Sequence, residues 1–276
     1  MSKKIDQVTA TKWKRVLAAV KQITQKRMIE KQLGIGTYFD NWVLSLEESQ
    51  VIPSQALLNG MLAQLNDQRF CDFKSRYRRR ATTLSDLSQS TVILSQGLKG
   101  GLSWSGLSLL KSAFDLALYV RLLDEIRPST IIEIGSGSGA SAIFFADLCR
   151  SLGCACHVTS VDVRIPQIEH PDVTFVEGDC SNIARLMPIS QLRTVPRPLI
   201  VIEDAHQCVK EVLCHFSSIM LPGDRFVVED SADKQEIIQS FLCDIDSSFL
   251  VDTAYTDFFG FNGTSAINSF LVKIDR

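Results

Sequence analysis

The sequence has no long apolar run. Although 45% of its 276 residues are hydrophobic, no stretch approaches the roughly 20 consecutive apolar residues that a membrane-spanning helix needs. The first ten residues, MSKKIDQVTA, lack the apolar core of a secretory signal. We therefore expect a cytoplasmic protein without a membrane partner.

Closely spaced cysteine pairs are also scarce. The eight cysteines are scattered, and only Cys154 and Cys156 lie close together. A Cys-x-Cys with no second pair nearby lacks the ligand set of a structural zinc site. A chain without a secretion signal is not expected to form disulfides. We expect reduced, partly buried thiols at positions 71, 149, 154, 156, 180, 208, 214 and 243.

Charge is divided unevenly along the chain. Residues 1–80 carry 15 Lys and Arg against 7 Asp and Glu, so the formal net charge of −2 leaves −10 for residues 81–276. The basic run KSRYRRRA, residues 74–81, could bind nucleic acid. Such clusters more often form a solvated face or pair with acidic parts of the same chain or of a neighbouring subunit. We expect a homo-oligomer and no nucleic-acid partner.

The chain divides into two regions. Apolar residues recur at helical spacing in residues 12–33, and a second helix is expected at 54–65. A polar connector at 81–91 marks the boundary. Residues 1–90 are thus predicted to form a helical N-terminal region for oligomerisation or for covering an active site, and residues 91–276 a separate domain.

The second region alternates strands with helices. Short apolar strands such as STIIEIG, HVTSVDV, VTFVEGD, PLIVIEDA and RFVVED are separated by helical segments, which is typical of an α/β fold with a mostly parallel sheet covered on both faces. Two further strands flank Asn262-Gly263, a hairpin signal. We expect a seven-stranded sheet that ends in an antiparallel C-terminal hairpin.

A glycine-rich turn follows the first of these strands. In IIEIGSGSGASA, residues 131–142, Glu133 precedes Gly135, Gly137 and Gly139. Bare backbone and a helix N-terminus are typical of sites for adenosine-containing ligands. A dinucleotide site uses G-x-G-x-x-G and holds a pyrophosphate, which the Glu133 carboxylate would repel. The turn therefore favours S-adenosylmethionine, with its cationic amino group and sulfonium, over a nicotinamide-dependent oxidoreductase.

Two further acids end the next two strands. Asp162 can accept hydrogen bonds from both ribose hydroxyls, and Asp179 lies where the adenine would bind. An aspartate at a strand end is often only a turn or a helix cap. Acids at three successive strand ends reinforce the ligand hypothesis, because ligands of open α/β sheets bind at the carboxyl ends of the strands.

Paired acids follow two more strands, in VIEDAH and VVEDS. Such a cluster is costly unless protons or a cation neutralise it, and Mg²⁺ is a hard ion that prefers oxygen ligands. Alternatively, some of these acids cap helices or pair with Lys210 and Arg225. Beside a metal and a methyl donor, His206 is a candidate for removing a proton from a hydroxyl. The four acids are Glu203, Asp204, Glu229 and Asp230.

Several motifs in order carry a resemblance to a known family. The stretch WSGLSLLKSAFDLALYVRLLDEIRPSTIIEIGSGSGASAIFFAD begins at Trp104 and includes Gly106, Lys111, Asp115 and Tyr119, and SVDV, VEGDCS, IEDAH, VVEDS and YTDFFGFN follow it. Over about residues 98–276 the chain resembles the cephalosporin hydroxylase family, S-adenosylmethionine-dependent O-methyltransferases of antibiotic and sugar-modifying pathways.

The resemblance implies a Rossmann-like methyltransferase fold for residues 91–276 and a Mg²⁺-assisted O-methyltransferase acting on a small hydroxylated secondary metabolite or sugar. It implies Mg²⁺ at Glu203, Glu229 and Asp230, with His206 as base. The family usually has Asp where this chain has Glu203, so Asp204 is an alternative first ligand. The expected S-adenosylmethionine-binding residues are Glu133, Gly135, Gly137, Gly139, Ser141, Asp162, Asp179 and Cys180.

The nature of the acceptor is left open by these motifs. The donor site does not report the acceptor atom, so an N-methyltransferase is an alternative, as is a binding protein that has kept the fold without the chemistry. Aromatic residues could line an apolar acceptor pocket, although they are as often core. The candidates are Trp104, Tyr255, Phe258, Phe259 and Phe261.

Overall fold

The computed structural model describes residues 69–79, 84–244 and 248–275. The helices expected at 12–33 and 54–65 lie outside the described residues. The predicted N-terminal region is therefore described only over residues 69–79 and 84–90.

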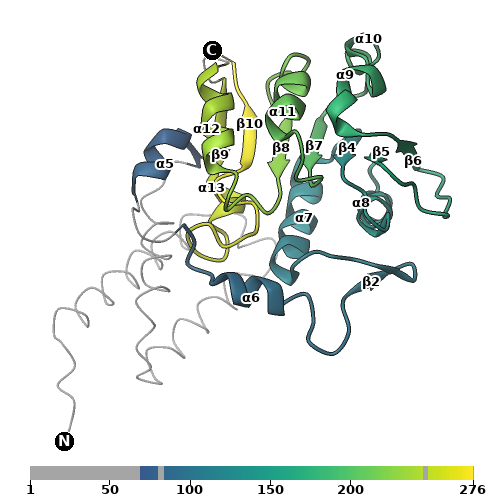
Figure 1. The fold of residues 1–276 in the computed structure, drawn as a ribbon, viewed down its shortest axis with the longest axis horizontal. Coiled ribbons are helices and arrows are strands. Elements are labelled where there is room, and N and C mark those ends of the chain that lie inside the picture. Colours follow the sequence, from purple (N-terminus) through teal and green to yellow (C-terminus); the bar gives the residue numbers. More distant parts are fainter. Residues whose placement is uncertain (1–68, 80–83, 245–247, 276) are drawn as a thin grey trace, which may run out of the picture. The chain divides into compact units, whose positions relative to one another are not determined.

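Two fully buried strands form the centre of the sheet. They are β4 (Thr130–Ile134) and β7 (Leu199–Glu203), which pair in parallel. The strands β5 (His157–Asp162) and β6 (Val173–Glu177) extend the sheet on one side, and β8 (Arg225–Val228) extends it on the other, all in parallel (Figure 1). Parallel strands that are buried on both faces read as continuous apolar runs, as the sequence of these segments does.

Antiparallel strands complete the edge beyond β8. The strand β10 (Phe270–Lys273) lies between β8 and β9 (Phe249–Asp252), and β1 (Phe70–Cys71) pairs with β9. In the described residues the sheet therefore has eight strands, one more than the seven expected. The antiparallel C-terminal pair is confirmed. Its connection is longer than a two-residue turn, because α13 (Thr253–Thr256) and the loop 257–269 intervene. Buried Asn262 holds this loop by donating to the carbonyl oxygen of Leu84 and accepting from Arg76.

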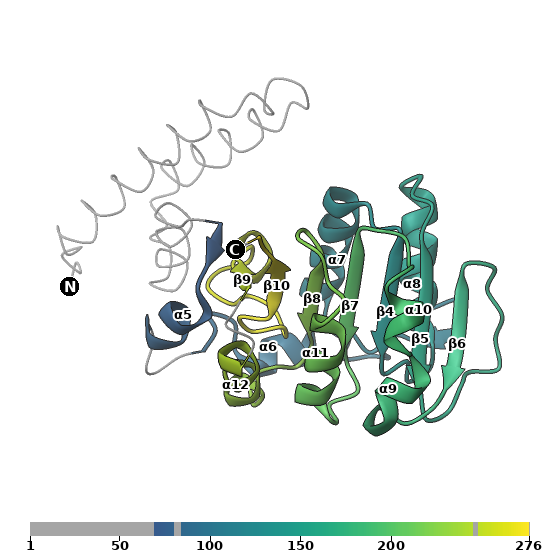
Figure 2. The ribbon, with the colours of Figure 1, turned by 90° about the horizontal axis from the view of Figure 1, so that it is seen from above.

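Helices cover both faces of the sheet (Figure 2). One face carries α7 (Ala113–Ile126) and α8 (Ala140–Ser151), and the other carries α9 (Ile183–Leu186), α11 (Val209–Ser217) and α12 (Gln235–Asp244). Side chains of β4 alternate between the two layers: Ile131 packs in the α7/α8 core, and Ile132 and Ile134 pack in the α11/α12 core. Each buried side chain of this size contributes about 1.5–3 kcal/mol, so the two cores fix which face each strand residue takes.

Shorter elements surround the sheet. They are α5 (Phe73–Arg79), α6 (Gln89–Leu94), the hairpin of β2 (Ser103–Trp104) and β3 (Leu107–Ser108), the 3₁₀ turn η1 (Cys180–Asn182) and α10 (Ile189–Leu192). On α5, the guanidinium of Arg76 is buried and donates to Asp257 and Asn268. This member of the basic run therefore pairs with the acidic part of the same chain.

All eight cysteines lie in the described residues and are free thiols. Among the described helices, none combines the length and the apolar composition that crossing a membrane requires.

Candidate active site

The glycine turn joins β4 to α8 in a left-handed backbone conformation. Gly135, Gly137 and Gly139 have φ of 104°, 52° and 83°. A Cβ on Gly135 would lie 2.6 Å from the backbone nitrogen of Ala205 and from the carbonyl carbon of Asp204, whereas a Cβ on Gly137 would meet nothing within 4 Å. Gly135 is thus required by the close approach of the chain that leaves β7, and Gly137 faces open space.

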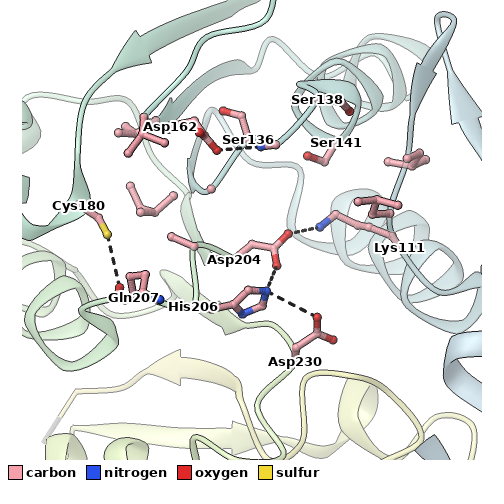
Figure 3. Close-up of a pocket in the computed structure, with 18 of the residues that line it drawn as sticks. Lys111, Ser136, Ser138, Ser141, Asp162, Cys180, Asp204, His206, Gln207 and Asp230 are labelled. Atoms are coloured by element: carbon pink, nitrogen blue, oxygen red, sulfur yellow. Dashed lines mark hydrogen bonds and ion pairs between the residues drawn. The ribbon is translucent and has the colours of Figure 1, made fainter. Parts of the chain in front are cut away.

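A cavity of about 550 Å³ lies at the carboxyl ends of the parallel strands (Figure 3). Its volume falls within the range of small-molecule sites, about 300–1,000 Å³. Four predicted site residues, Glu133, Gly139, Glu203 and Glu229, are not part of its lining. The predicted residues that do line it are Gly135, Gly137, Ser141, Asp162, Asp179, Cys180, Asp204, His206 and Asp230.

The two aspartates after β5 and β6 also hold the local backbone. Asp162 accepts from the backbone N–H groups of Gly137 at 2.9 Å and Arg164 at 3.1 Å. Asp179 caps η1 by accepting from the N–H of Ser181 at 2.8 Å, and this bond lowers the pKa of the Asp179 carboxyl. Asp179 therefore acts as a cap, which was the alternative interpretation of an aspartate at a strand end. Its exposed side chain also borders the cavity.

Glu133 precedes Ile134 of the cavity lining and lies on the face of β4 that carries α8. Its side chain is fully buried, and its Oε2 accepts from the hydroxyl of Ser160 at 2.6 Å. Its Oε1 has no hydrogen-bond partner among the described residues. Burial raises the pKa of this carboxyl, against the opposing charge of Lys111. A buried carboxylate with an unpaired oxygen suits a cationic or hydrogen-bond-donating group above it.

Asp204, His206 and Asp230 form a group at the exits of β7 and β8. One ligand atom from each lies within 4.8 Å of the others. The Nε2 of His206 is 3.6 Å from Oδ1 of Asp204 and 3.7 Å from Oδ2 of Asp230. His206 has a left-handed backbone (φ 59°), as does Asp230 (φ 43°). Non-glycine residues with positive φ are uncommon and concentrate at functional sites.

Glu203 points away from this group. It ends β7 with a fully buried side chain, whose Oε1 accepts from the backbone N–H of His206 at 2.9 Å and whose Oε2 accepts from Lys234 at 3.1 Å. Burial raises the pKa of its carboxyl, against the charge of Lys234. The structure therefore brings Asp204, and not Glu203, to the cavity.

Lys234 also fixes the ring of His206. Its buried ammonium donates to Glu203, to Nδ1 of His206 at 2.8 Å and to the carbonyl oxygen of Glu229 at 2.7 Å. An ammonium has three donors and no acceptor, so Nδ1 must accept. The neutral ring then carries its hydrogen on Nε2, which faces Asp204 and Asp230.

Glu229 is held on the opposite side by Lys111. The fully buried Lys111 ammonium lies 2.7 Å from both carboxylate oxygens of Glu229 and 3.0 Å from Oδ2 of Asp204, and the hydroxyl of Tyr119 also donates to Glu229. Burial raises the pKa of Glu229, and the charge of Asp204 adds to this effect. Burial alone would lower the pKa of Lys111, but the negative charges of Asp204, Glu229 and Glu133 raise it.

The acids that follow β7 and β8 do not pair with Lys210 and Arg225, the partners considered from the sequence. Lys210 pairs with Asp244, and Arg225 lies near Asp252. The residues that neutralise the cluster are instead Lys111 and Lys234, whose roles the sequence did not reveal. No spacing signal could have found them, since Lys111 is 93 residues from Asp204 and Lys234 is 31 residues from Glu203.

The aromatic residues proposed for the acceptor pocket pack elsewhere. Trp104 donates to Asp147 and contacts Phe144 edge-on, and Tyr255 is buried and stacked on Phe270. The cavity described above is lined without them and without Phe258, Phe259 and Phe261.

Comparison with known families gives a match over residues 97–272, to the family described as Rhamnosyl O-methyltransferase/CmcI. Among curated proteins, a rhamnosyl O-methyltransferase from Mycobacterium leprae (strain TN) is 31% identical over 191 residues, which are 62% of this chain and 82% of that protein. A rhamnosyl O-methyltransferase from Mycobacterium tuberculosis (strain ATCC 25618 / H37Rv) is 28% identical over 200 residues, 63% of this chain and 81% of that protein.

Solved structures of CmcI share the fold. A CmcI structure with Mg and SAM superposes with a TM-score of 0.55 at 23% identity, covering 83% of this chain and 99% of that chain. An apo structure of CmcI gives a TM-score of 0.56, also at 23% identity, covering 84% of this chain and all of that chain. At this identity the likeness supports the Rossmann-like methyltransferase fold alone.

Proposed function

Because this chain belongs to the rhamnosyl O-methyltransferase/CmcI family, we propose that it transfers the methyl group of S-adenosylmethionine to a hydroxyl of a sugar-type small molecule, assisted by Mg²⁺. The new O–CH₃ bond forms as the S–CH₃ bond breaks. The sulfur keeps the electron pair and becomes the thioether of S-adenosylhomocysteine, and the hydroxyl proton passes to the protein.

The cavity fits S-adenosylmethionine as donor. Gly137 leaves open space above the turn, and Asp162 and Asp179 border the cavity where the ribose and the adenine are expected. Glu133, next in the chain to Ile134 of the cavity lining, keeps one buried oxygen without a hydrogen-bond partner in the described part of the chain. These features suit a ligand with hydroxyls at one end and a cationic amino group at the other.

The residues that would hold Mg²⁺ are Asp204 and Asp230. Mg²⁺ is usually bound by one or two carboxylates, with water and substrate completing its shell, so two carboxylates facing one cavity are sufficient. We do not assign Glu203 or Glu229 as ligands, because both oxygens of each are bonded, those of Glu203 to His206 N–H and Lys234 and those of Glu229 to Lys111. Asp204 gives only Oδ2 to Lys111, which leaves Oδ1 for the ion. When bound, the ion supplies positive charge that lowers the pKa of a hydroxyl beside it.

His206 is assigned as the proton acceptor. Its Nε2 faces the cavity between Asp204 and Asp230. With its hydrogen on Nε2 the ring cannot accept a proton there, so that hydrogen must first leave to water while Nδ1 takes one up from water. Nδ1–H then loses its bond from Lys234, which keeps those to Glu203 and to the carbonyl oxygen of Glu229. Proton acceptance is therefore coupled to the contact between Lys234 and Nδ1.

The observation that carries this proposal is the convergence of Asp204, His206 and Asp230 at the same cavity as the glycine turn. Two carboxylates for an ion and an imidazole for a proton lie beside the predicted donor site, at the strand ends where ligands of α/β sheets bind. Holding both reactants there would supply most of the acceleration by orientation.

Calorimetric titration of S-adenosylmethionine into the protein, with Mg²⁺ and after chelation, tests the donor site. We expect binding in both conditions. Transfer of labelled methyl to methyl α-L-rhamnopyranoside should require Mg²⁺. D204N and D230N should each weaken Mg²⁺ binding by at least about tenfold. The control D172N removes an acid that pairs with Arg150 and should leave Mg²⁺ binding unchanged. Absence of donor binding in both conditions would refute the proposal.

A cytoplasmic location, a homo-oligomeric state, a role in secondary metabolism, and the division of the chain near residue 90 stay predictions from the sequence.

A further inference from the structure

Two segments border the candidate donor site from outside the main sheet. The β2–β3 hairpin leads into residues 108–111, all of which line the cavity. The loop 163–172 joins β5 to β6 and contributes its first residue to the lining. Figure 3 shows Ser136 of the glycine turn between Asp162, which precedes the loop, and Lys111, which ends 108–111. The two segments thus flank the glycine turn on opposite sides.

Asp147 of α8 bonds to both segments. Its Oδ2 accepts from the indole N–H of Trp104 in the hairpin at 2.8 Å, and its Oδ1 lies 3.1 Å from Nε2 of His170 in the loop. Because Nδ1 of His170 accepts from the backbone N–H of Asp172, the neutral ring carries its hydrogen on Nε2 and donates it to Asp147. One carboxylate therefore joins the hairpin and the loop, each through one oxygen.

The bonds to Asp147 are partly shielded from water. The side chain of His170 is 11% exposed and that of Asp147 is 31% exposed, and the ring of Trp104 packs edge-on against Phe144, with 5.1 Å between the ring centres. Hydrogen bonds to an ionised carboxylate are about twice as strong as those between neutral groups, and a lower local dielectric strengthens them further. The two bonds therefore stabilise the positions of the hairpin and the loop on α8.

Both segments also contact the glycine turn. The hydroxyl of Ser138 donates to the carbonyl oxygen of Ser108 at 2.5 Å. On the loop, Pro166 lies against Gly139, where an added Cβ would be 2.6 Å from the Cγ of Pro166. A shift of either segment would therefore be transmitted to the turn that borders the cavity.

We propose that Asp147 is a positioning residue for the methyl donor: it holds the β2–β3 hairpin and the loop 163–172 on α8, so that the cavity is preformed for S-adenosylmethionine. Asp147, Trp104 and His170 are not part of the described cavity lining, so their effect on the donor passes through the two segments. A preformed site loses less conformational freedom on binding, which raises its affinity. This inference rests on the proposed methyltransferase function.

The test uses five variants of the full chain. D147A removes both bonds, W104F removes only the bond to the hairpin and keeps an aromatic ring, H170A removes only the bond to the loop, and W104F/D147A combines two of these changes. The control D124N changes an exposed acid of α7 that pairs with Arg127 and does not line the cavity.

Three measurements are made on each variant. Calorimetry gives the affinities for S-adenosylmethionine and for Mg²⁺, and urea denaturation shows that the variant is folded. Transfer of labelled methyl to methyl α-L-rhamnopyranoside, with Mg²⁺ present, gives kcat at saturating donor and KM for the donor separately.

We expect D147A to weaken donor binding at least about tenfold, with unchanged kcat at saturating donor and unchanged Mg²⁺ affinity. W104F and H170A should each weaken donor binding by a smaller factor. In the D147A background W104F should cause no further loss, because both changes remove the same bond. D124N should match the wild type.

Unchanged donor affinity in folded D147A would refute the positioning role while the methyltransferase function stands. A fully additive loss in W104F/D147A would also refute it, since Trp104 would then act by packing alone. If D147A does not fold, unchanged donor affinity in both W104F and H170A refutes the role. If the wild type binds no S-adenosylmethionine, the proposed function itself is refuted, and the role of Asp147 with it.

Discussion

Replacing Gly135 by alanine tests how closely the glycine turn packs against the chain that leaves β7. Gly135 has φ of 104°, and an added Cβ would lie 2.6 Å from the nitrogen of Ala205 and 2.7 Å from the carbonyl oxygen of Asp204. A side chain in left-handed backbone costs about 1–2 kcal/mol, and inserting a methyl group into packed backbone costs about 1–3 kcal/mol more. We expect G135A to lower the free energy of unfolding by about 2–5 kcal/mol in urea denaturation.

A matched variant separates the two contributions. Gly223 has φ of 95°, and a Cβ there would meet nothing within 4 Å, so G223A carries the backbone cost without the clash. The difference between G135A and G223A should be about 1–3 kcal/mol. Because relief of the clash moves Asp204, G135A should also weaken Mg²⁺ binding in calorimetry. Equal stability of the two variants would show that the turn does not pack against Asp204 and Ala205 as the structure indicates.

Three further predictions concern buried charges and the proton acceptor. K111M should destabilise the protein by about 3–5 kcal/mol in urea denaturation, because it leaves buried carboxylates without their cation, and a loss under about 1 kcal/mol would contradict the pairing. H206A should lower kcat about 10²–10⁴-fold with unchanged affinity for S-adenosylmethionine, and an unchanged kcat would remove His206 as the base. Burial raises the pKa of Glu133 above its ordinary 4.5, so the folded state binds its proton more tightly than the unfolded state. Above pH 4.5 the wild type should therefore lose stability relative to E133Q by up to about 1.4 kcal/mol per pH unit, until the raised pKa is passed. If the wild type and E133Q differ by the same free energy of unfolding at pH 5 and at pH 7.5 in urea denaturation, the pKa of Glu133 is not raised.

Much of the fold follows from local pattern. The strand at 130–134 and the glycine turn after it are read from apolar residues that end in glycine, and the structure places β4 there. The parallel order follows from the alternation of strands and helices, because a parallel pair needs a crossover. The eighth strand could not be predicted, since β1 has only two residues and pairs with β9, far along the chain.

Only some residues of the candidate site could be predicted from the sequence. Asp162 ends β5, Asp204 follows β7 directly and Asp230 lies two residues beyond β8, and all three reach the cavity, because carboxyl ends of parallel strands meet at one edge. Aromatic residues of 255–261 were not assignable from the sequence. An apolar ring satisfies a core and a pocket equally well, and packing placed Tyr255 in the core.

The sequence by itself determined the class of site: a glycine turn, acids at successive strand ends and a histidine after the fourth strand specify a donor pocket and an oxygen-rich cluster through local backbone geometry. Only the tertiary structure decided which acids reach the cavity. Glu203 is the last residue of β7 and faces Lys234 in the interior, whereas Asp204, one residue beyond the strand, turns into the cavity. Lys111 and Lys234 come from distant segments, and their ammonium groups bond oxygens of Glu203, Asp204 and Glu229. Which carboxylate oxygens are bonded in this way depends on packing.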